Sequence, residues 1–282
     1  MSAAEIIRSH AVPMEPIPAG REAGGQLRAR IHAALFDVYG TLLISHAGDI
    51  AAAHKDQRTT GRLRTLLSDY GCTQSEDAVI AEFFRAVAKS HEEMRNQGIE
   101  CPEVQIERIW QAVLGIRDAD AARDFAAAFE MIVNPCYPMP HLEALFSGLR
   151  KKSIRMGIIS NAQFYTPPAF QALCGGLPEE LGFLRELIFY SYRHQVAKPC
   201  RDLFRMAAAA LENLGIKAEN TLYAGNDMRN DIMPAAAEGF QTDLFAGDRR
   251  SLRIRADDPR CNGVQPDLVL TDWRQLLHHI NE

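Results

Sequence analysis

Short apolar segments alternate with helical repeats along the second half of the chain, and this alternation predicts its secondary structure. Residues 31–37 (IHAALFD) are nearly all apolar, which is typical of a strand buried on both faces of a parallel sheet. Beyond Pro140, similar segments recur between amphipathic stretches such as 203–214. We predict further strands at 154–160, 187–192, 221–225, 240–245 and 268–270. The alternation is typical of an α/β fold with a doubly wound parallel sheet.

The stretch from about 49 to 135 has apolar residues at helical spacing and no convincing strand. Thr73 and Glu76 have the spacing of a capping box ahead of a helix at about 75–96. Pro102 is positioned to open a second helix, and a third begins near Asp118. The strand at 31–37 precedes this stretch and its partners follow it, so the helices are best explained as an insertion. We predict an N-terminal arm at 1–28, a Rossmann-like core at 29–46 and 138–282, and an inserted helical cap domain at 47–137.

Composition and charge narrow the functional classes. With 47% hydrophobic and 24% charged residues, the 282-residue chain has the values of an ordinary globular protein. A formal net charge of −5 gives no support to a surface for nucleic acid or an anionic membrane. No apolar run has the length of a membrane span, and the scattered cysteines favour free thiols in a reducing compartment. We expect a cytoplasmic monomer or homodimer that acts on a small anionic molecule and binds neither nucleic acid nor membrane.

Polar residues that could carry chemistry follow the predicted strands. Asp37 and Ser160 end two strands, Lys198 follows a third, and Asp227 and Asp231 follow a fourth. In a parallel sheet these strand ends lie at one edge. Asp37 could attack there as a nucleophile while Ser160 and backbone N–H groups hold substrate oxygens. Lys198 would offset the charge of a transferring phosphoryl group, and the two later aspartates could hold Mg²⁺.

Four short motifs around these residues resemble, in order and spacing, those of the haloacid dehalogenase-like (HAD) hydrolase superfamily. They are FDVYGTL at 36–42, IISN at 158–161, Lys198-Pro199 and GNDMRND at 225–231. The resemblance covers about residues 30–275 and implies a Rossmann-like core with a cap inserted between the first two motifs. It also implies that the catalytic residues are Asp37, Tyr39, Thr41, Ser160, Asn161 and Lys198. By the same resemblance, the Mg²⁺ ligands are Asp37, the backbone carbonyl of Tyr39, Asp231 and either Asn226 or Asp227.

Several positions depart from the superfamily's patterns. Tyr39 stands where the phosphatases have an aspartate that protonates the leaving group, and a phenol with a pKa of about 10 is a poor substitute. Tyrosine at this position resembles the L-2-haloacid dehalogenase branch, whose aspartate displaces halide without a metal. That branch also has an early arginine, which residues 44–55 lack, and a tyrosine where Phe204 stands. Asn226 occupies the place of the phosphatases' first aspartate in the fourth motif.

The resulting prediction is a Mg²⁺-dependent phosphatase that acts on a small phosphorylated metabolite through an aspartyl-phosphate at Asp37. Two alternatives stay open: a metal-independent hydrolase of carbon–halogen bonds, and a HAD-like protein with weakened catalysis that binds a ligand. In the predicted cap, His91 and Arg95 lie one helical turn apart. They are candidates for contact with an anionic substrate, although such a row of charges on a helix is usually a solvated face.

Overall fold

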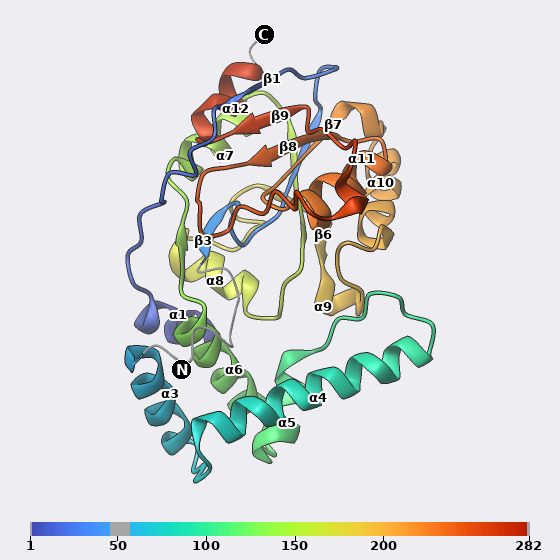
Figure 1. Cartoon of the computed structure of the whole chain (residues 1–282). Coiled ribbons are helices and arrows are strands. Elements are labelled where there is room, and N and C mark those ends of the chain that lie inside the picture. Colours follow the sequence, from blue (N-terminus) through green and yellow to red (C-terminus); the bar gives the residue numbers. More distant parts are fainter. Residues whose placement is uncertain (1, 46–56, 281–282) are drawn as a thin grey trace.

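A seven-stranded β-sheet forms the centre of the molecule in this computed structural model, which describes residues 2–45 and 57–280 (Figure 1). The strand order is β1-β9-β8-β7-β2-β5-β6, and all neighbouring strands are parallel except β1 and β9, which pair antiparallel. The strands are β1 (Gly24–Gly25), β2 (Ala33–Phe36), β5 (Arg155–Ser160), β6 (Phe183–Tyr190), β7 (Thr221–Gly225), β8 (Gln241–Phe245) and β9 (Leu268–Leu270). Strands β5 and β6 lie on one side of β2 and strands β7 to β9 on the other, which confirms the predicted α/β sheet.

Successive residues of β2 point to opposite faces of the sheet and enter two different hydrophobic cores. Ala34 and Phe36 pack in the core that includes residues of α7, α8 and α12, whereas Leu35 packs with residues of α10 and α11. These helices are α7 (Leu142–Lys151), α8 (Thr166–Leu173), α10 (Asp202–Asn213), α11 (Met233–Ala237) and α12 (Trp273–His279). All residues of β2 are fully buried, as the apolar run in the sequence predicts for a strand covered on both faces.

Strand β6 begins at Phe183, earlier than the predicted start at 187. Arg185 and Glu186 within it are exposed, whereas the residues from Leu187 onward are buried. The apolar pattern in the sequence therefore detects only the second half of this strand.

Between β3 (Leu43–Ser45) and β4 (Cys136–Pro138), which pair antiparallel, the described chain is helical as predicted. We call its helices the helical block: α3 (Gln57–Asp69), α4 (Glu76–Asn96), α5 (Ile106–Leu114) and α6 (Ala119–Val133). An aromatic cluster fills its interior, where the ring of Phe83 stacks on that of Trp110 at 4.5 Å between centroids. Residues 47–56 of the predicted cap lie outside the described residues, and β4 begins one residue before the predicted end of the cap at 137.

Two of the predicted helix starts in the block are wrong. Helix α4 is capped by Ser75, whose hydroxyl accepts a hydrogen bond from the backbone N–H of Ala78 at 3.3 Å, and not by Thr73. Pro102 does not open a helix: it forms an isolated antiparallel bridge with Val196 of the core, and α5 begins only after Gln105. No helix within residues 2–45 and 57–280 is long and apolar enough to cross a membrane.

The predicted N-terminal arm contains regular structure that the sequence pattern did not indicate. Helix α1 (Ala3–His10) begins with a capping box formed by Ser2 and Glu5. Its apolar side chains Ile6 and Ile7 are buried, and the helix packs against both α6 of the helical block and α8 of the core (Figure 1). Helix α1 has only about two turns, so the spacing of its apolar residues repeats too few times to predict a helix from the sequence alone.

Candidate active site

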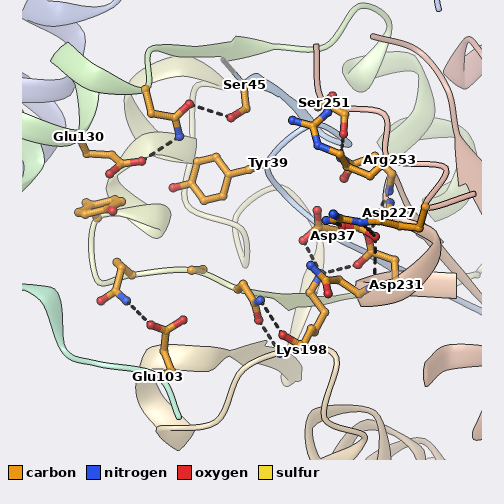
Figure 2. A pocket seen from close by; sticks show the side chains of 18 residues that line it. Asp37, Tyr39, Ser45, Glu103, Glu130, Lys198, Asp227, Asp231, Ser251 and Arg253 are labelled. Atoms are coloured by element: carbon orange, nitrogen blue, oxygen red, sulfur yellow. Dashed lines mark hydrogen bonds and ion pairs between the residues drawn. The ribbon is translucent and has the colours of Figure 1, made fainter. Parts of the chain in front are cut away.

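The carboxyl edge of the sheet gathers the predicted catalytic residues around one pocket. Asp37 follows β2, Ser160 ends β5 and Asn226 follows β7, so the three come from adjacent strands. Lys198 comes from the loop after α9 (Ser191–His194). A pocket of about 320 Å³ opens beside Asp37. The opposite wall includes side chains from α6 and from the loop between α4 and α5 (Figure 2).

Asp37 is the best-placed nucleophile of the site. Its Oδ1 atom accepts hydrogen bonds from Ser160 Oγ and from Lys198 Nζ, both at 2.8 Å. No described residue donates to Oδ2, and Asp37 lines the pocket. One carboxylate oxygen is therefore fixed and the other is left for a substrate. Ser160 is fully buried and does not line the pocket, so in this structure it orients Asp37 and does not hold substrate oxygens.

Lys198 joins the two buried carboxylates of the site. Its Nζ atom lies 2.8 Å from Asp37 Oδ1 and 2.5 Å from Asp231 Oδ1. Burial alone lowers the pKa of Lys198, but the two carboxylates together raise it above its usual range, so the ammonium stays charged. Asn161 holds the Lys198 backbone: its Oδ1 accepts from the Lys198 N–H at 2.7 Å, and its Nδ2 donates to the Lys198 carbonyl at 3.2 Å.

Four protein donors surround Asp231, and both of its oxygens are occupied. Oδ1 accepts from Lys198 Nζ and from the hydroxyl of Tyr223 at 3.0 Å, while Oδ2 accepts from the backbone N–H groups of Asn226 and Asp227. Burial raises the pKa of Asp231 to about 6, with Lys198 opposing the rise and Asp37 adding to it. Asp231 thus fixes the position of Lys198 and has no oxygen lone pair left for a further ligand.

The two candidates for the acidic fourth motif both face protein partners. Asp227 accepts two hydrogen bonds from Arg255, at 3.1 Å and 2.6 Å, and also caps the turn that follows it. Burial raises the pKa of Asp227, but the hydrogen bonds from Arg255 and from the turn leave it below its usual value. Asn226 accepts from Thr41 Oγ1 at 3.1 Å and donates through Nδ2 to the Ser251 carbonyl at 2.6 Å. An aspartate at 226 would lose that donor, which accounts for the asparagine here.

The donor set decides how well Mg²⁺ would fit this site. Mg²⁺ is usually held by one or two carboxylates together with waters and substrate phosphates. Asp231 is saturated and Asp227 is paired with Arg255, so Asp37 Oδ2 is the one carboxylate oxygen among the three that no described residue donates to. No three acidic side chains at this edge, among the described residues, bring their oxygens within 4.8 Å of one another. In this arrangement the residues fit a Mg²⁺ ion poorly.

Tyr39 cannot replace the aspartate that acts as general acid in the phosphatases. Its hydroxyl lies 2.9 Å from Thr166 Oγ1, and the residue is half-buried and lines the pocket. Burial raises the pKa of Tyr39 well above 10, and the nearby groups Cys136 and Glu130 raise it further. The phenol therefore keeps its proton at neutral pH and acts here as a wall of the pocket.

The end of the pocket beside Tyr39 carries two half-buried carboxyl groups, and no cation of the described residues forms an ion pair with either. Glu130, from α6, accepts from Asn134 Nδ2 at 2.9 Å, and Glu103 accepts from Ser191 Oγ at 2.8 Å. Burial raises the pKa of both, and the hydrogen bonds they accept oppose the rise. Figure 2 shows both carboxyl groups on the side of the pocket away from Asp37 and Lys198.

An unpaired cation lines the pocket near Asp37. Arg253 donates to the carbonyls of Arg250 and Leu252, and no ion pair joins it to a carboxylate of the described residues. It is therefore available to an anionic ligand. His91 and Arg95, the predicted substrate contacts of the cap, do not line this pocket, and Arg95 is exposed. Burial lowers the pKa of His91, and the neighbouring charge of Arg95 lowers it further.

The sequence did not single out several groups of the site: Glu130, Arg253 and Arg255, which line the pocket, and Tyr223, which contacts Lys198. Tyr223 lies in an apolar strand, where it reads as a core residue. The two arginines belong to a run of basic residues, RRSLRIR at 249–255, that resembles a solvated loop. That run follows a strand at the carboxyl edge of the sheet, and this position is the one feature of the sequence that could have assigned the two arginines to the site.

Comparison with known proteins places this site in a family. The model of the haloacid dehalogenase-like hydrolases matches residues 31–239, which contain Asp37, Ser160, Lys198 and Asp231. The chain belongs to this family of hydrolases. The solved structures similar to this HAD hydrolase confirm the fold. No curated protein matches the chain.

Three solved structures illustrate how far the likeness extends. The HAD-hydrolase YfnB from Bacillus subtilis, bound to magnesium, is 19% identical with a TM-score of 0.51, covering 90% of this chain and 100% of that one. A 2-haloacid dehalogenase from Pseudomonas syringae pv. Tomato DC3000 is 16% identical with a TM-score of 0.58, covering 89% and 98%. The L-2-haloacid dehalogenase PA0810 is 14% identical with a TM-score of 0.55, covering 89% and 99%. At these identities the likeness to this HAD hydrolase is one of fold.

Proposed function

We propose that this chain is a metal-independent HAD hydrolase that displaces halide from a small 2-halocarboxylate through an ester at Asp37. The observation that carries the proposal is the closed set of hydrogen bonds around Asp231 and Asp227. Lys198, Arg255 and backbone N–H groups supply donors to these carboxylates, so their charge is balanced without a further cation. Asp37 keeps one unpaired oxygen, which is what a nucleophile requires.

Tyr39 favours a leaving group that departs without a proton. Burial raises the pKa of its phenol well above 10, so it does not donate a proton at neutral pH. Halide is a weak base and leaves as a stable anion. An alkoxide released from a phosphate ester would instead need a general acid within reach.

The reaction proceeds in two balanced steps. Asp37 Oδ2 attacks the carbon that carries the halogen: a C–O bond forms as the carbon–halogen bond breaks, and the bonding electrons leave with the halide. Water then attacks the carbonyl carbon of the Asp37 ester, which releases a 2-hydroxy acid and a proton and restores the carboxylate. Lys198, 2.8 Å from Asp37 Oδ1, stabilises the negative charge that develops on the carboxyl oxygen in this second step.

The substrate is a small anion, and two features of the pocket support this. Arg253 offers a guanidinium that no carboxylate of the described residues neutralises. The volume of about 320 Å³ suits a molecule of a few carbon atoms. We propose that the helical block serves as the cap of the enzyme, since Glu103 and Glu130 bring its side chains to the wall of the pocket. There it would exclude water from the first step.

Phosphomonoester hydrolysis with Mg²⁺ is the second candidate, and a different observation favours it. Burial raises the pKa values of Glu103 and Glu130, which is the direction that a general acid in place of Tyr39 requires. When bound, Mg²⁺ would offset the charge of the phosphate. This function requires Asp227 to exchange Arg255 for the cation, which makes it the less economical explanation of the geometry.

One panel of substrates separates the two candidates. The enzyme is incubated with 2-chloro- and 2-bromocarboxylates and with alkyl and aryl phosphates, each with Mg²⁺ and with EDTA. We expect halide release that EDTA does not change. Phosphate release that requires Mg²⁺ would favour the second candidate, and inertness toward every compound would point to a ligand-binding protein.

A further inference from the structure

The helical block touches the core at a second place, directly beside the loop that carries Lys198. The loop between α4 and α5 runs antiparallel to the segment that follows α9 (Figure 1). The N–H of Ala197 donates to the carbonyl of Cys101 at 2.8 Å, and the N–H of Glu103 donates to that of Gln195 at 3.1 Å. These two bonds join the block to the core next to the catalytic lysine.

Two cysteines face each other across this junction. Cys101 Sγ, on the block side, lies 2.6 Å from Cys200 Sγ, which is two residues beyond Lys198. A disulfide bond is about 2.05 Å long, so only a small movement of the side chains would bring the two sulfur atoms to bonding distance. We propose that Cys101 and Cys200 are a redox pair that an oxidant such as a peroxide converts into a disulfide between the helical block and the core.

The exposure of the two thiols sets the order of events. Cys101 is half-buried and open to solvent on one side, whereas Cys200 is buried. Burial and the neighbouring Cys101 raise the pKa of the Cys200 thiol to about 12, which makes it a poor first nucleophile toward peroxide. Cys101 therefore reacts first and becomes a sulfenic acid, with release of one water. Cys200 then attacks that sulfur, forms the S–S bond and releases a second water, so one peroxide oxidises two thiols.

The alternative to a disulfide at this junction is a bound metal ion. The ligand atoms of Glu100, Cys101 and Cys200 lie within 4.8 Å of one another. Two thiolates bound to one tetrahedral zinc at about 2.3 Å each would keep their sulfur atoms roughly 3.7 Å apart. The observed 2.6 Å is too short for that arrangement. Glu100 is also exposed, so the geometry favours a bond between the two sulfurs.

The bond would fix the helical block to the loop of the catalytic lysine. Without that bond, only noncovalent contacts hold the junction, among them the two backbone hydrogen bonds and the hydrogen bond from Ser191 to Glu103. A covalent link between Cys101 and Cys200 would hold it closed and slow the exchange of ligands with the pocket. Formation of the bond does not depend on which reaction the enzyme catalyses.

Thiol counting on the full-length protein tests the pair. Purified enzyme is treated with hydrogen peroxide, quenched, unfolded and titrated with a thiol reagent. We expect the number of free thiols to fall from six to four and to return to six with dithiothreitol. A digest without reductant should contain one cross-linked peptide pair that carries Cys101 and Cys200. Amide hydrogen exchange in residues 97–105 should slow by about tenfold in the oxidised protein.

Matched variants make the result specific. Cys101→Ser and Cys200→Ser should each abolish the cross-link, while Cys72→Ser, which removes another half-buried thiol of the helical block, should leave it intact. Cys101→Ser replaces the more exposed partner and is the variant more certain to fold. Six free thiols after complete oxidation of added glutathione would overturn the proposal. A cross-link between other cysteines would do the same, and so would stoichiometric zinc that is lost in Cys101→Ser.

Discussion

The hydroxyl of Tyr223 lies 3.1 Å from the ammonium of Lys198 and supplies a polar contact that the sequence motifs do not contain. Its single proton lies between two acceptors, Asp231 Oδ1 at 3.0 Å and the carbonyl oxygen of Ile159 at 2.9 Å. Phe204, which stands where the dehalogenase branch has tyrosine, packs edge-on against the Tyr223 ring with 5.0 Å between centroids. A hydroxyl from β7 therefore contacts Lys198, whereas Phe204 has no hydroxyl to offer.

Tyr223→Phe should impair the enzyme through the position of Lys198. The change removes hydrogen bonds to two charged groups, each typically worth about 1.5–3 kcal/mol, so we expect kcat to fall by roughly tenfold or more. The variant also leaves Asp231 with one donor fewer, which moves its pKa, already raised to about 6, further up. The acidic limb of the rate profile of halide release should shift to higher pH. Tyr192→Phe is the control, and an identical pH profile in both variants would refute a positioning role.

Glu130→Gln should stabilise the protein at alkaline pH. Burial raises the folded-state pKa of Glu130 above its value in the unfolded chain, and no cation of the described residues pairs with it. The folded state therefore binds the proton more tightly, so wild-type stability declines as the pH rises from the ordinary carboxyl range toward the raised pKa. The variant has no such proton. Its urea midpoint should exceed that of the wild type at about pH 8 and match it near pH 4.

Glu92→Gln serves as the control, because Glu92 is exposed on α4. Its midpoints should follow the wild type at both pH values. If Glu130→Gln is destabilised equally at each pH, the hydrogen bonds from Asn134 and Tyr165 outweigh the cost of burying the charge.

Ile7→Ala should loosen the contact between the helical block and the core. Ile7 is 1% exposed in α1, which packs against α6 and α8 at once. Truncation of a buried isoleucine to alanine typically costs about 2–5 kcal/mol. We expect a lower melting temperature, whereas Ile17→Ala, at a side chain that is 37% exposed, should change it little. Equal melting temperatures of the two variants would mean that α1 does not contribute to the stable fold.

The parts of the fold that the sequence predicted are those with long apolar patterns. The residues of β2 are buried on both faces, and this burial requires the apolar run that made the strand legible. The sequence did not predict helix α1, because two turns are too short to establish a helical period of apolar residues, although Ser2 and Glu5 form its capping box. Pro102 suggested a helix start, but a pairing with Val196, far away in the sequence, determines its conformation.

The candidate site divides in the same way. Asp37, Lys198 and Asp231 follow strands whose ends meet at one edge, so their proximity could be predicted from topology. The orientation of Asp227 could not, because it depends on Arg255, which reaches the site from a loop after β8. The saturation of Asp231 likewise depends on Tyr223, whose hydroxyl direction follows from the register of β7. Contacts between distant segments thus decide which carboxylate is free, and sequence spacing does not contain them.

Arg255→Gln should create a response to Mg²⁺ that the wild type lacks. In the wild type Arg255 neutralises Asp227, so millimolar Mg²⁺ or EDTA should leave the melting temperature and the rate of halide release unchanged. Removing the guanidinium leaves the Asp227 carboxylate without its cationic partner beside Asp37, and Mg²⁺ favours such oxygen ligands. The variant should melt at a higher temperature with Mg²⁺ than with EDTA. Arg260→Gln, which removes an exposed partner of Asp258, should show no such difference.

A wild-type enzyme that already requires Mg²⁺ would contradict this expectation. It would show that Asp227 exchanges Arg255 for the cation and would favour phosphomonoester hydrolysis.

The fate of water oxygen identifies the bond that Asp37 makes. In the proposed reaction water attacks the carbonyl carbon of the Asp37 ester, so one turnover in heavy-oxygen water should place the label in the Asp37 carboxylate. With an aspartyl-phosphate, water attacks phosphorus, and the label should appear in the released phosphate. Mass spectrometry of the peptide that contains Asp37 distinguishes the two, with Glu103 and Glu130 peptides as internal controls. Asp37→Asn keeps the size of the side chain and should abolish both label and turnover. Activity retained in that variant, or a label in the product alone during 2-haloacid turnover, would exclude Asp37 as the nucleophile.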